Sequence, residues 1–312
     1  MARQTFEDWI PEEWGGPVIT KVMQTSVIEG DNVRREPMST DTKHVLRDDG
    51  GMDVGGAIGK GVAYDEDTQT NDSVLLTVRK LGRVLRVADE DMKDTAGLVD
   101  ILATKRLAYA RSYAIGFDNA CLGITAASNG TTRPFDSLYY KLTQANAAVG
   151  YSANSNITTP TTAGLTYDNV SDTFELVETS DFWEDGSMVV FAHPAFKAAL
   201  RNILDDQGRP VFLEHQSQVS GSPATLMGVP VKWTLGAKTD GVITKKPFGK
   251  PLLFVGNGNY LLRGDRSPLE YKVASPDSGP AFLTDEGLLK VRRRVAFAVG
   301  NENAWACIHG VG

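Results

Sequence analysis

Apolar and small residues recur at the spacing of a helix between residues 98 and 115. The positions that share one side of this helix are Leu98, Ile101, Leu102, Ala108, Tyr109, Ser112 and Ile115. Asp94 or Thr95 can cap its first turn, and the pattern continues to about Leu122. The sequence therefore predicts a helix of about 25 residues, roughly 37 Å in length, which is long for a globular domain.

The middle of the chain alternates between helix and strand patterns. A helix from Asp168 has an apolar face formed by Val170, Phe174 and Val177. The apolar run Met188–Ala192 is typical of a buried strand. A second helix is predicted from Pro194, because proline suits the first helical position. Its apolar face consists of Phe196, Leu200, Ile203 and Leu204. Another strand is predicted at Met227–Val231.

The last third of the chain is rich in strand patterns. Short strands are predicted at residues 252–255, 260–262 and 269–273. Between residues 289 and 299 apolar and charged positions alternate, which places Lys290, Arg292 and Arg294 opposite an apolar face. Helices and strands in this order predict an α+β fold with an α/β-like middle module.

Residues 1–46 show little periodicity and predict an extended arm. Proline and glycine interrupt this segment, and Trp9 and Trp14 are among its isolated apolar residues. Because a tryptophan buries a large area, such an arm needs a surface to lie on, and a neighbouring subunit can supply it. Residues 26–36 are expected to add an edge strand.

Residues 47–87 predict a projecting β-hairpin. Its glycine-rich first part contains Lys60, and the apolar run at residues 74–78 favours a strand. Lys80–Arg83 is predicted to form a turn before a second strand at residues 84–87. Since glycine loses much conformational entropy when it is ordered, contacts made outside the hairpin are expected to hold it.

Composition and charge narrow the range of functions. With 41% hydrophobic and 23% charged residues, the 312-residue chain has the composition of a globular protein with a sizeable core. A formal net charge of −7 argues against a protein that grips nucleic acid, although not against one that encloses it. No apolar run suits a membrane span or a secretory signal, so synthesis in the cytoplasm is expected. Cys121 and Cys307 are expected to be reduced and buried.

No arrangement of residues predicts catalysis, a metal site or a cofactor. The histidines, which lack metal-ligand spacing, are His44, His193, His215 and His309. Val54 and Gly61 stand where a phosphate-binding loop around Lys60 would need other residues. Arg263–Asp265 is expected to form a turn, and the arginines at 292–294 are expected to form ion pairs with carboxylates. A hydrolase whose catalytic triad assembles in space stays open.

Several short motifs resemble those of one family of shell proteins. The acidic run at residues 87–94 resembles the lead-in to that family's long helix, and Phe117–Gly123 resembles its ending. Phe191–Pro194 and the later Gly208–Pro210 are similar to a strand, helix start and turn that follow in the family. Leu226–Val231, with the letters LMGVPV, is close to its L-x-G-x-P-V pattern. In this order the motifs resemble major capsid proteins of tailed bacteriophages, which have the Hong Kong 97 fold.

The resemblance covers nearly the whole chain and implies named parts. These are an N-arm at residues 1–46, an E-loop hairpin at 47–87, a P-domain spine helix at 88–134, an A-domain at 135–250, and the P-domain β-sheet with a C-terminal return at 251–312. The implied function is self-assembly into an icosahedral virion shell of hexamers and pentamers that encloses phage double-stranded DNA without sequence-specific binding. An encapsulin-type compartment, which shares the fold, is the alternative.

The resemblance also implies partners and contacts. Besides other copies of itself, the subunit is expected to meet a portal protein at one vertex and, where they exist, scaffolding and decoration proteins. Assembly is expected in the bacterial cytoplasm without a membrane. The residues expected at contacts between subunits are Trp9, Trp14, Lys60, Val74, Leu76, Val78, Arg292 and Arg294.

Two departures from the family pattern lead to further expectations. The hairpin begins within about 50 residues of Met1, which leaves no room for the long, proteolytically removed extension of some members. The type member joins an E-loop lysine to a P-domain asparagine of another subunit. Lys60 could donate, but no asparagine lies between Leu261 and Gly300, so no such crosslink is expected.

Overall fold

The computed structural model describes residues 21–48, 56–61, 63–64, 71–95, 101–161, 164–204, 225–274 and 285–311. The chain forms two compact units. The smaller unit comprises Met1–Met23, Arg83–Ala110 and Tyr271–Val291, and the larger unit comprises Gln24–Gly82, Arg111–Glu270 and Arg292–Gly312. No helix in the described ranges is both long enough and apolar enough to span a membrane.

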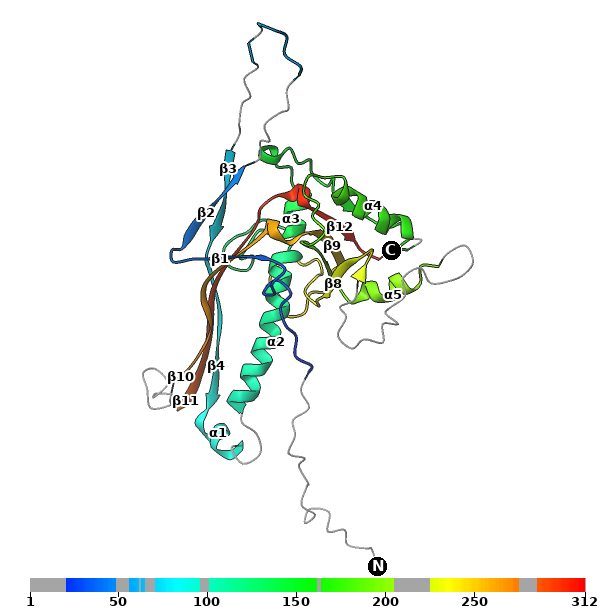
Figure 1. Cartoon of the computed structure of the whole chain (residues 1–312). Coiled ribbons are helices and arrows are strands. Elements are labelled where there is room, and N and C mark those ends of the chain that lie inside the picture. The colour runs from blue at the N-terminus through cyan, green and yellow to red at the C-terminus, as the bar shows by residue number, and fades with distance from the viewer. Residues whose placement is uncertain are drawn as a thin grey trace, which may run out of the picture. The chain divides into compact units, whose positions relative to one another are not determined.

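A six-stranded sheet lies in the larger unit (Figure 1). In order across the sheet, its strands are β5 (Ile157–Thr158), β12 (Trp305–His309), β9 (Leu252–Asn257), β6 (Met188–Ala192), β8 (Val229–Trp233) and β7 (Thr225–Leu226). β9 is antiparallel to both β12 and β6, whereas β6 and β8 run parallel. The predicted buried strand at 188–192 is confirmed, because every residue of β6 is buried. Since β9 and β12 follow residue 250, a boundary at that position divides this sheet.

Two helices, α4 (Tyr167–Glu178) and α5 (Ala195–Arg201), cover one face of the six-stranded sheet. Both helices were predicted. Thr166 caps α4, whose buried residues are Val170, Thr173, Phe174 and Val177. The buried residues of α5 are Phe196 and Leu200. Leu204, which was predicted on the same face, is 55% exposed because the helix ends at Arg201.

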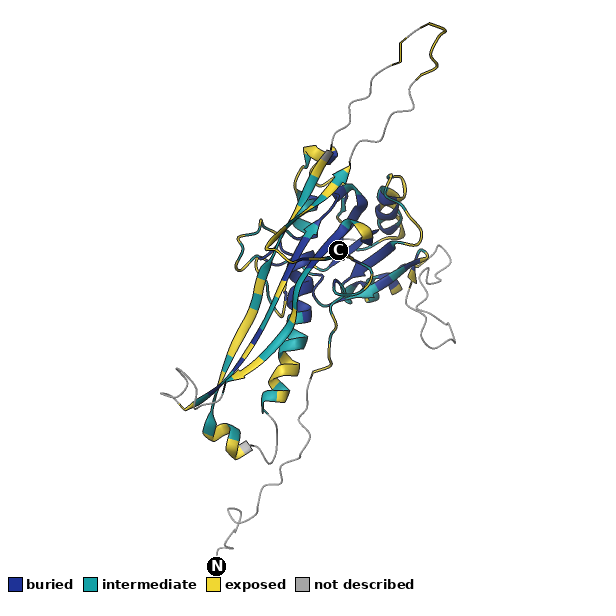
Figure 2. Ribbon diagram, turned by 60° about the vertical axis from the view of Figure 1, so that its left-hand side comes forward, coloured by how far each residue is buried: buried dark blue, intermediate teal, exposed yellow. Residues whose placement is uncertain are grey.

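The opposite face of the sheet is covered by α2 (Ile101–Leu122) and α3 (Leu138–Thr143). The predicted end of the long helix at Leu122 is confirmed. However, the helix lacks a single apolar stripe: residues 101–110 are exposed or half-buried, whereas all nine residues of Ala114–Leu122 are buried. Figure 2 shows this change of colour along the helix. The end of α2 is buried all round because segments 26–28 and 234–244 pack against it together with the sheet.

A second sheet has four strands. In order, these are β1 (Arg34–Pro37), β10 (Leu261–Ala274), β11 (Glu286–Val299) and β4 (Arg79–Ala88). β1 is an edge strand parallel to β10, close to the position predicted for it. The alternation predicted in β11 is confirmed by its buried residues Leu289, Val291, Val295, Phe297 and Val299.

Strand β10 replaces two predicted strands and the turn between them. Arg263–Asp265 lies inside this strand, so the prediction of a turn was wrong. Gly264 is needed for packing, because a Cβ atom there would lie 2.3 Å from the sulfur of Met38 and 2.9 Å from the Cβ of Ala296. A glycine that signals a turn in the sequence thus marks a close approach between side chains and a strand.

β2 (Thr42–Asp48) and β3 (Asn71–Thr77) form a separate antiparallel pair in the larger unit. Their register runs from Thr42 opposite Thr77 to Asp48 opposite Asn71. The strands predicted at residues 74–78 and 84–87 correspond to β3 and to part of β4, but the predicted pairing was wrong, because β3 pairs with β2, which precedes the glycine-rich segment. The turn predicted at Lys80–Arg83 was also wrong, since these residues lie within β4 and continue the four-stranded sheet.

The smaller unit contains α1 (Asp89–Thr95) and parts of α2, β4, β10 and β11. The acidic run that was expected to lead into the long helix forms α1 itself. Asp94 and Thr95, the predicted caps of the long helix, are the last residues of α1, and residues 96–100 lie outside the described ranges. The backbone N–H of Asp89 donates a hydrogen bond of 3.0 Å to the carbonyl oxygen of Asp285.

Both cysteines lie in the larger unit. Cys121 and Cys307 are fully buried and free, which confirms the expectation of two reduced, buried thiols. Burial raises the pKa of each thiol well above its usual value, so both stay protonated at neutral pH. Short 3₁₀ helices are found at Ala147–Val149, Gly258–Tyr260 and Glu302–Ala304.

Candidate functional site: assembly surfaces

The outer face of β2 and β3 exposes apolar side chains. Residues directly opposite in an antiparallel pair share a face. We call this surface the outer hairpin face, and its members are Thr42, His44, Leu46, Ser73, Leu75 and Thr77. Leu46 is 88% exposed and Leu75 is 49% exposed. Neither leucine contributes much to the core of its own chain, so the face is available to another molecule.

The inner face of the same strands packs against the body of the larger unit. Leu76 is fully buried in a small cluster with Met38, Leu262 and Ala296. The half-buried residues that pack against this cluster are Val45, Val74, Val78 and Ala298. Leu76 was expected to contact a neighbouring subunit. Its side chain is instead enclosed by its own chain and offers no surface to a partner.

Arg47 fixes the pair β2–β3 to its own chain. Its Nη1 donates to the carbonyl oxygen of Gly300 at 2.7 Å, and its Nη2 lies 2.6 Å from an oxygen of Asp72. Hydrogen bonds from the backbone N–H of Ser73 and from Arg47 hold the pKa of Asp72 below its usual value. The outer hairpin face is therefore presented by a ribbon that is tied down on its other side.

A buried carboxylate fixes the chain where it leaves the N-terminal segment. Asp118 of α2 is fully buried and accepts hydrogen bonds from the Ser26 hydroxyl and from the backbone N–H groups of Val27 (3.1 Å) and Ile28 (3.4 Å). Thr234 donates a further bond at 2.6 Å. Burial raises the pKa of Asp118 to about 6, and the four hydrogen bonds offset this only in part. Asp118 thus holds residues 26–28 to α2 by hydrogen bonds, in addition to the packing of Val27 and Ile28 in the core.

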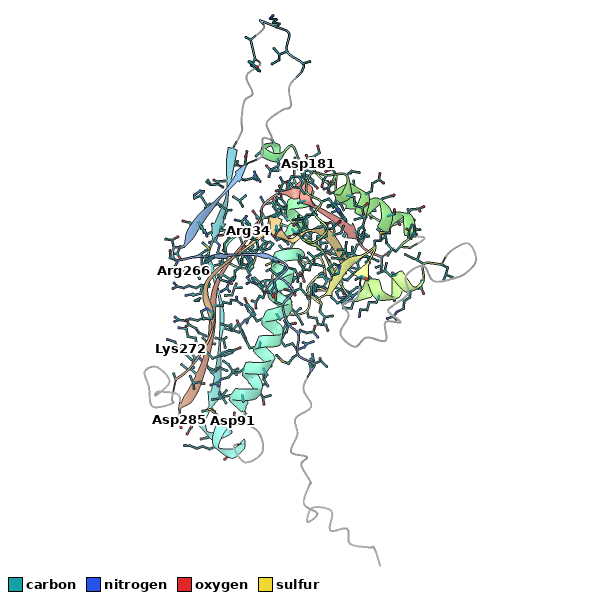
Figure 3. The ribbon with its side chains drawn as sticks, viewed as in Figure 1. Arg34, Asp91, Asp181, Arg266, Lys272 and Asp285 are labelled. Carbon is teal, nitrogen blue, oxygen red and sulfur yellow. The ribbon has the colours of Figure 1, made fainter. Side chains whose placement is uncertain are left out.

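Arginines and carboxylates form a dense network on β1, β10 and β11. The Asp265 carboxylate lies 2.8 Å from Arg35 and 3.1 Å from both Arg263 and Arg293. Arg293 also pairs with Glu29. Figure 3 labels two further members, Arg34 and Arg266, which pair with Glu36 and Asp41, respectively. Several of these pairs, such as Arg35 with Asp265 and Arg293 with Glu29, join residues far apart in the sequence within one chain.

The ion pairs expected for the arginine run are confirmed for two of its members. Arg292 lies 2.8 Å from Glu270, and Arg293 pairs as described above. Arg294 is exposed, and its backbone N–H donates to Ser267 at 3.1 Å. Of the two arginines expected at subunit contacts, Arg294 has the more accessible side chain.

The described residues contain no group of His, Cys, Asp and Glu side chains that could hold a metal ion. His193 has a structural role, since its Nδ1 accepts a hydrogen bond of 3.0 Å from the backbone of Ala195 at the start of α5. Burial, together with nearby Lys238, lowers the pKa of His193 to about 4. This imidazole is therefore neutral at physiological pH.

One cavity of about 410 Å³ lies between the β2–β3 pair and the loop that precedes α3. Its charged lining residues are Arg47, Asp72, Arg79, Asp136, Lys141 and Glu302. Arg47 pairs with Asp72, Lys141 lies 3.9 Å from Asp136, and Glu302 accepts hydrogen bonds from Asn146. No His or Cys is among the described residues that line it. Its polar groups are largely occupied with one another.

The remaining residues expected at subunit contacts are Lys60, Trp9 and Trp14. Lys60 is exposed in the short described segment at residues 56–61. Trp9 and Trp14 lie outside the described residues. Sequence reasoning missed Leu46 and Leu75, although the alternation of residues 42–48 could have indicated a strand with Leu46 on its polar side.

Residues 7–309 match the phage capsid family. The chain belongs to this family. The match covers nearly the whole chain, so both units are parts of one capsid protein. Among curated protein sequences, no significant match was found.

Solved structures with the same fold come from phages and from a GTA particle. A chain from Mycobacterium phage Ogopogo has a TM-score of 0.75 and 15% identity, with 100% of both chains covered. A chain described as the capsid of a native GTA particle has a TM-score of 0.71 and 17% identity, with 98% of this chain and 97% of that chain covered. A chain from Microbacterium phage Oxtober96 has a TM-score of 0.70 and 15% identity, with 97% and 96% covered. The expected α+β capsid fold is confirmed, and the protein is a structural subunit of a shell.

Proposed function

We propose that this capsid subunit assembles with copies of itself into an icosahedral shell of hexamers and pentamers that encloses double-stranded DNA. The family match over residues 7–309 supports a shell subunit. The main observation that supports this assembly mechanism is the outer hairpin face. It exposes Leu46 and Leu75 on a pair of strands that Arg47 holds to the rest of the chain. Closed symmetry would repeat this contact in every capsomer, so a modest pairwise affinity suffices for a stable shell.

Each part of the chain has a proposed place in the shell. Residues 1–46 form the N-arm, 47–87 the E-loop, 88–134 the spine helix, 135–250 the A-domain and 251–312 the P-domain sheet with the C-terminal return. β2 extends the E-loop back to Thr42, because it pairs along its whole length with β3. The proposed contacts with neighbouring subunits are made by Trp9, Trp14, Lys60, Arg294 and the outer hairpin face.

The proposed partners follow from this role. Besides other copies of the subunit, they are a portal protein at one vertex and separate scaffolding and decoration proteins where the phage encodes them. Assembly takes place in the bacterial cytoplasm and uses neither catalysis nor a cofactor. The formal net charge of −7 suits a wall that encloses DNA without adhering to it. We therefore expect purified subunits to bind DNA weakly at physiological salt, and tight, salt-sensitive binding in a filter assay would contradict this.

Electron microscopy of the purified full-length protein tests the proposal directly. We expect uniform closed particles from the unaltered chain. The double variant Leu46→Asp with Leu75→Asp should remain folded but give dispersed subunits, because two charges would be buried at each contact. Leu204→Asp is the control, since Leu204 is an exposed leucine outside the hairpin. Particles from the double variant at the yield of the control would show that this face is not an assembly contact.

Lys60 allows a second test. No asparagine lies between Leu261 and Gly300 to accept a crosslink from this lysine. Particles boiled in denaturant should therefore run as one monomer band on a gel. A ladder of covalent oligomers that disappears in Lys60→Arg would overturn this expectation.

A further inference from the structure

An exposed aromatic side chain stands on the loop that follows β8. Phe248 is 84% exposed, more than any other aromatic residue that the structure describes in the larger unit. Val242, on the same loop, is 44% exposed. Burying a phenylalanine gains roughly 1.5–3 kcal/mol relative to leaving it in water. A phenylalanine held in water is therefore a candidate for contact with another molecule.

The loop holds Phe248 in place by contacts on both sides of it. Pro247 is buried. The backbone N–H of Gly249 donates to the carbonyl oxygen of Thr239 at 3.1 Å, and that of Lys250 donates to the Thr239 hydroxyl at 2.8 Å. A Cβ atom at Gly249 would lie 2.2 Å from Thr239, so the backbone fits closely there. The exposure of Phe248 thus results from an ordered loop, and a partner would meet a preorganised surface.

The same loop is strongly basic. Lys245, Lys246 and Lys250 are all exposed, and the segment 241–250 contains no carboxylate. Among the described residues, no carboxylate lies within ion-pair distance of any of these three lysines. An aromatic ring among three unpaired ammonium groups suits an acidic segment that also carries aromatic or apolar side chains.

One segment of this chain is acidic and also carries aromatic and apolar side chains. Residues 6–14 read Phe-Glu-Asp-Trp-Ile-Pro-Glu-Glu-Trp, with four carboxylates, three aromatic rings and no basic residue. Residues 174–185 are similarly acidic and aromatic, but Phe174 and Val177 of that stretch are buried in α4 of their own chain. From the anchor at Ser26, the twelve residues back to Trp14 can span at most about 40 Å, which is far enough to reach a neighbouring subunit.

We propose that residues 6–14 of one subunit dock on the basic loop 241–250 of a second copy, with tryptophan side chains against Phe248 and carboxylates beside its three lysines. This inference rests on the proposed self-assembly and names the surface that receives the N-arm. Double-stranded DNA would use the lysines but has no unpaired aromatic or apolar surface for Phe248. The acidic, aromatic segment matches both features of the loop.

Crosslinking in the full-length chain tests the contact. The double variant Glu13→Cys with Lys245→Cys leaves Phe248 and both tryptophans in place, and the two native cysteines are fully buried. A short bismaleimide, which joins two thiols without a redox step, should convert assembled protein into covalent dimers and larger oligomers on a denaturing gel. Glu13→Cys with Tyr167→Cys is the matched control, because Tyr167 is 45% exposed on a different element.

Charge reversal adds a specific readout. Adding Lys246→Glu and Lys250→Glu should lower the crosslinked fraction about five-fold, the scale expected for two solvent-exposed ion pairs. Further reversal of Glu7→Lys and Glu12→Lys should restore it.

Three outcomes would overturn the inference. A monomer in which one bismaleimide joins both introduced thiols, as intact mass spectrometry would show, would mean that the segment binds within its own chain. Crosslinking no greater than in the control, in particles that micrographs show to be intact, would remove the contact while leaving the proposed shell function standing. Charge reversal that weakens DNA binding without changing the crosslinked fraction would assign the loop to DNA. Failure of the unaltered protein to form particles would instead count against the proposed function itself.

Discussion

The six-stranded sheet and the β2–β3 pair bury their side chains to very different extents. β6 and β9 are buried on both faces, because α4 and α5 cover one side and α2 and α3 the other. In β2 and β3 only the inner face is covered, and Leu46 stays 88% exposed. The sheet therefore supplies the stability of the subunit, whereas the ribbon offers apolar area that is buried only when subunits meet. Both regions belong to the larger unit, so the same folded unit contains the stabilising sheet and the exposed apolar face.

The largest effect is expected from a cavity in the six-stranded sheet. Phe254 lies in the middle of β9 and is fully buried. Phe254→Ala should lower the free energy of unfolding by about 3–5 kcal/mol, because the lost contacts leave a cavity between the sheet and α2. Denaturant unfolding of the purified subunit measures this change. A loss below about 1 kcal/mol would mean that the sheet is not the stabilising core.

A somewhat smaller loss is expected where the polar anchor of residues 26–28 is removed. Asp118→Ala leaves the donors of Ser26, Val27, Ile28 and Thr234 without their acceptor. We expect a loss of about 3 kcal/mol in the free energy of unfolding. Hydrogen exchange should also speed up at the amides of Val27 and Ile28. Unchanged protection of these amides would show that other contacts hold the segment.

The pH dependence of the free energy of unfolding gives a second test of the role of Asp118. Burial raises the pKa of Asp118 to about 6, above its ordinary value of 3.8, so the folded state binds the proton more tightly than the unfolded state. Its contribution is therefore full below about pH 4 and is lost as the pH rises towards 6. Relative to Asp118→Asn, which does not titrate, the unaltered protein should lose about 2 kcal/mol between about pH 4 and pH 6. A constant difference between the two proteins across this range would contradict the raised pKa.

The smallest effect on folding is expected on the outer hairpin face. Leu46→Asp with Leu75→Asp should change the free energy of unfolding of the isolated subunit by no more than about 0.5 kcal/mol, as for other surface substitutions. The same variant should lose particle formation. Measuring both the free energy of unfolding and particle formation separates an effect on assembly from an effect on folding. A loss of several kcal/mol in the isolated subunit would mean that this face is buried within its own chain.

Local sequence patterns predicted an element correctly where its buried positions recur with the period of a strand or a helix. The apolar run of β6 and the alternation in β11 were predicted correctly, because one or both faces of these strands are buried along their length. The spacing of Val170, Phe174 and Val177 likewise predicted α4. Loose motifs such as Leu226–Val231 supported the capsid resemblance, and the match over residues 7–309 confirmed it.

Predictions failed at glycine residues, because glycine occurs both in turns and within strands. Gly264 between Arg263 and Asp265 is typical of a turn, but here it lets Met38 and Ala296 approach a continuous strand. Gly82 suggested a turn in the same way and lies within β4. In both cases the deciding contacts come from segments remote in the sequence, and composition carries no information about them.

The sequence by itself determined the mixed α+β class, the core-facing positions of the central elements and the resemblance to a capsid subunit, because these depend on periodicity and on the order of motifs. Only the tertiary structure decided which face of the hairpin is free. Leu76 and Leu75 are neighbours of the same type, yet Leu76 is fully buried and Leu75 is 49% exposed. The difference arises because successive strand residues point to opposite sides, and only the pairing of β2 with β3 over Met38, Leu262 and Ala296 covers one of those sides.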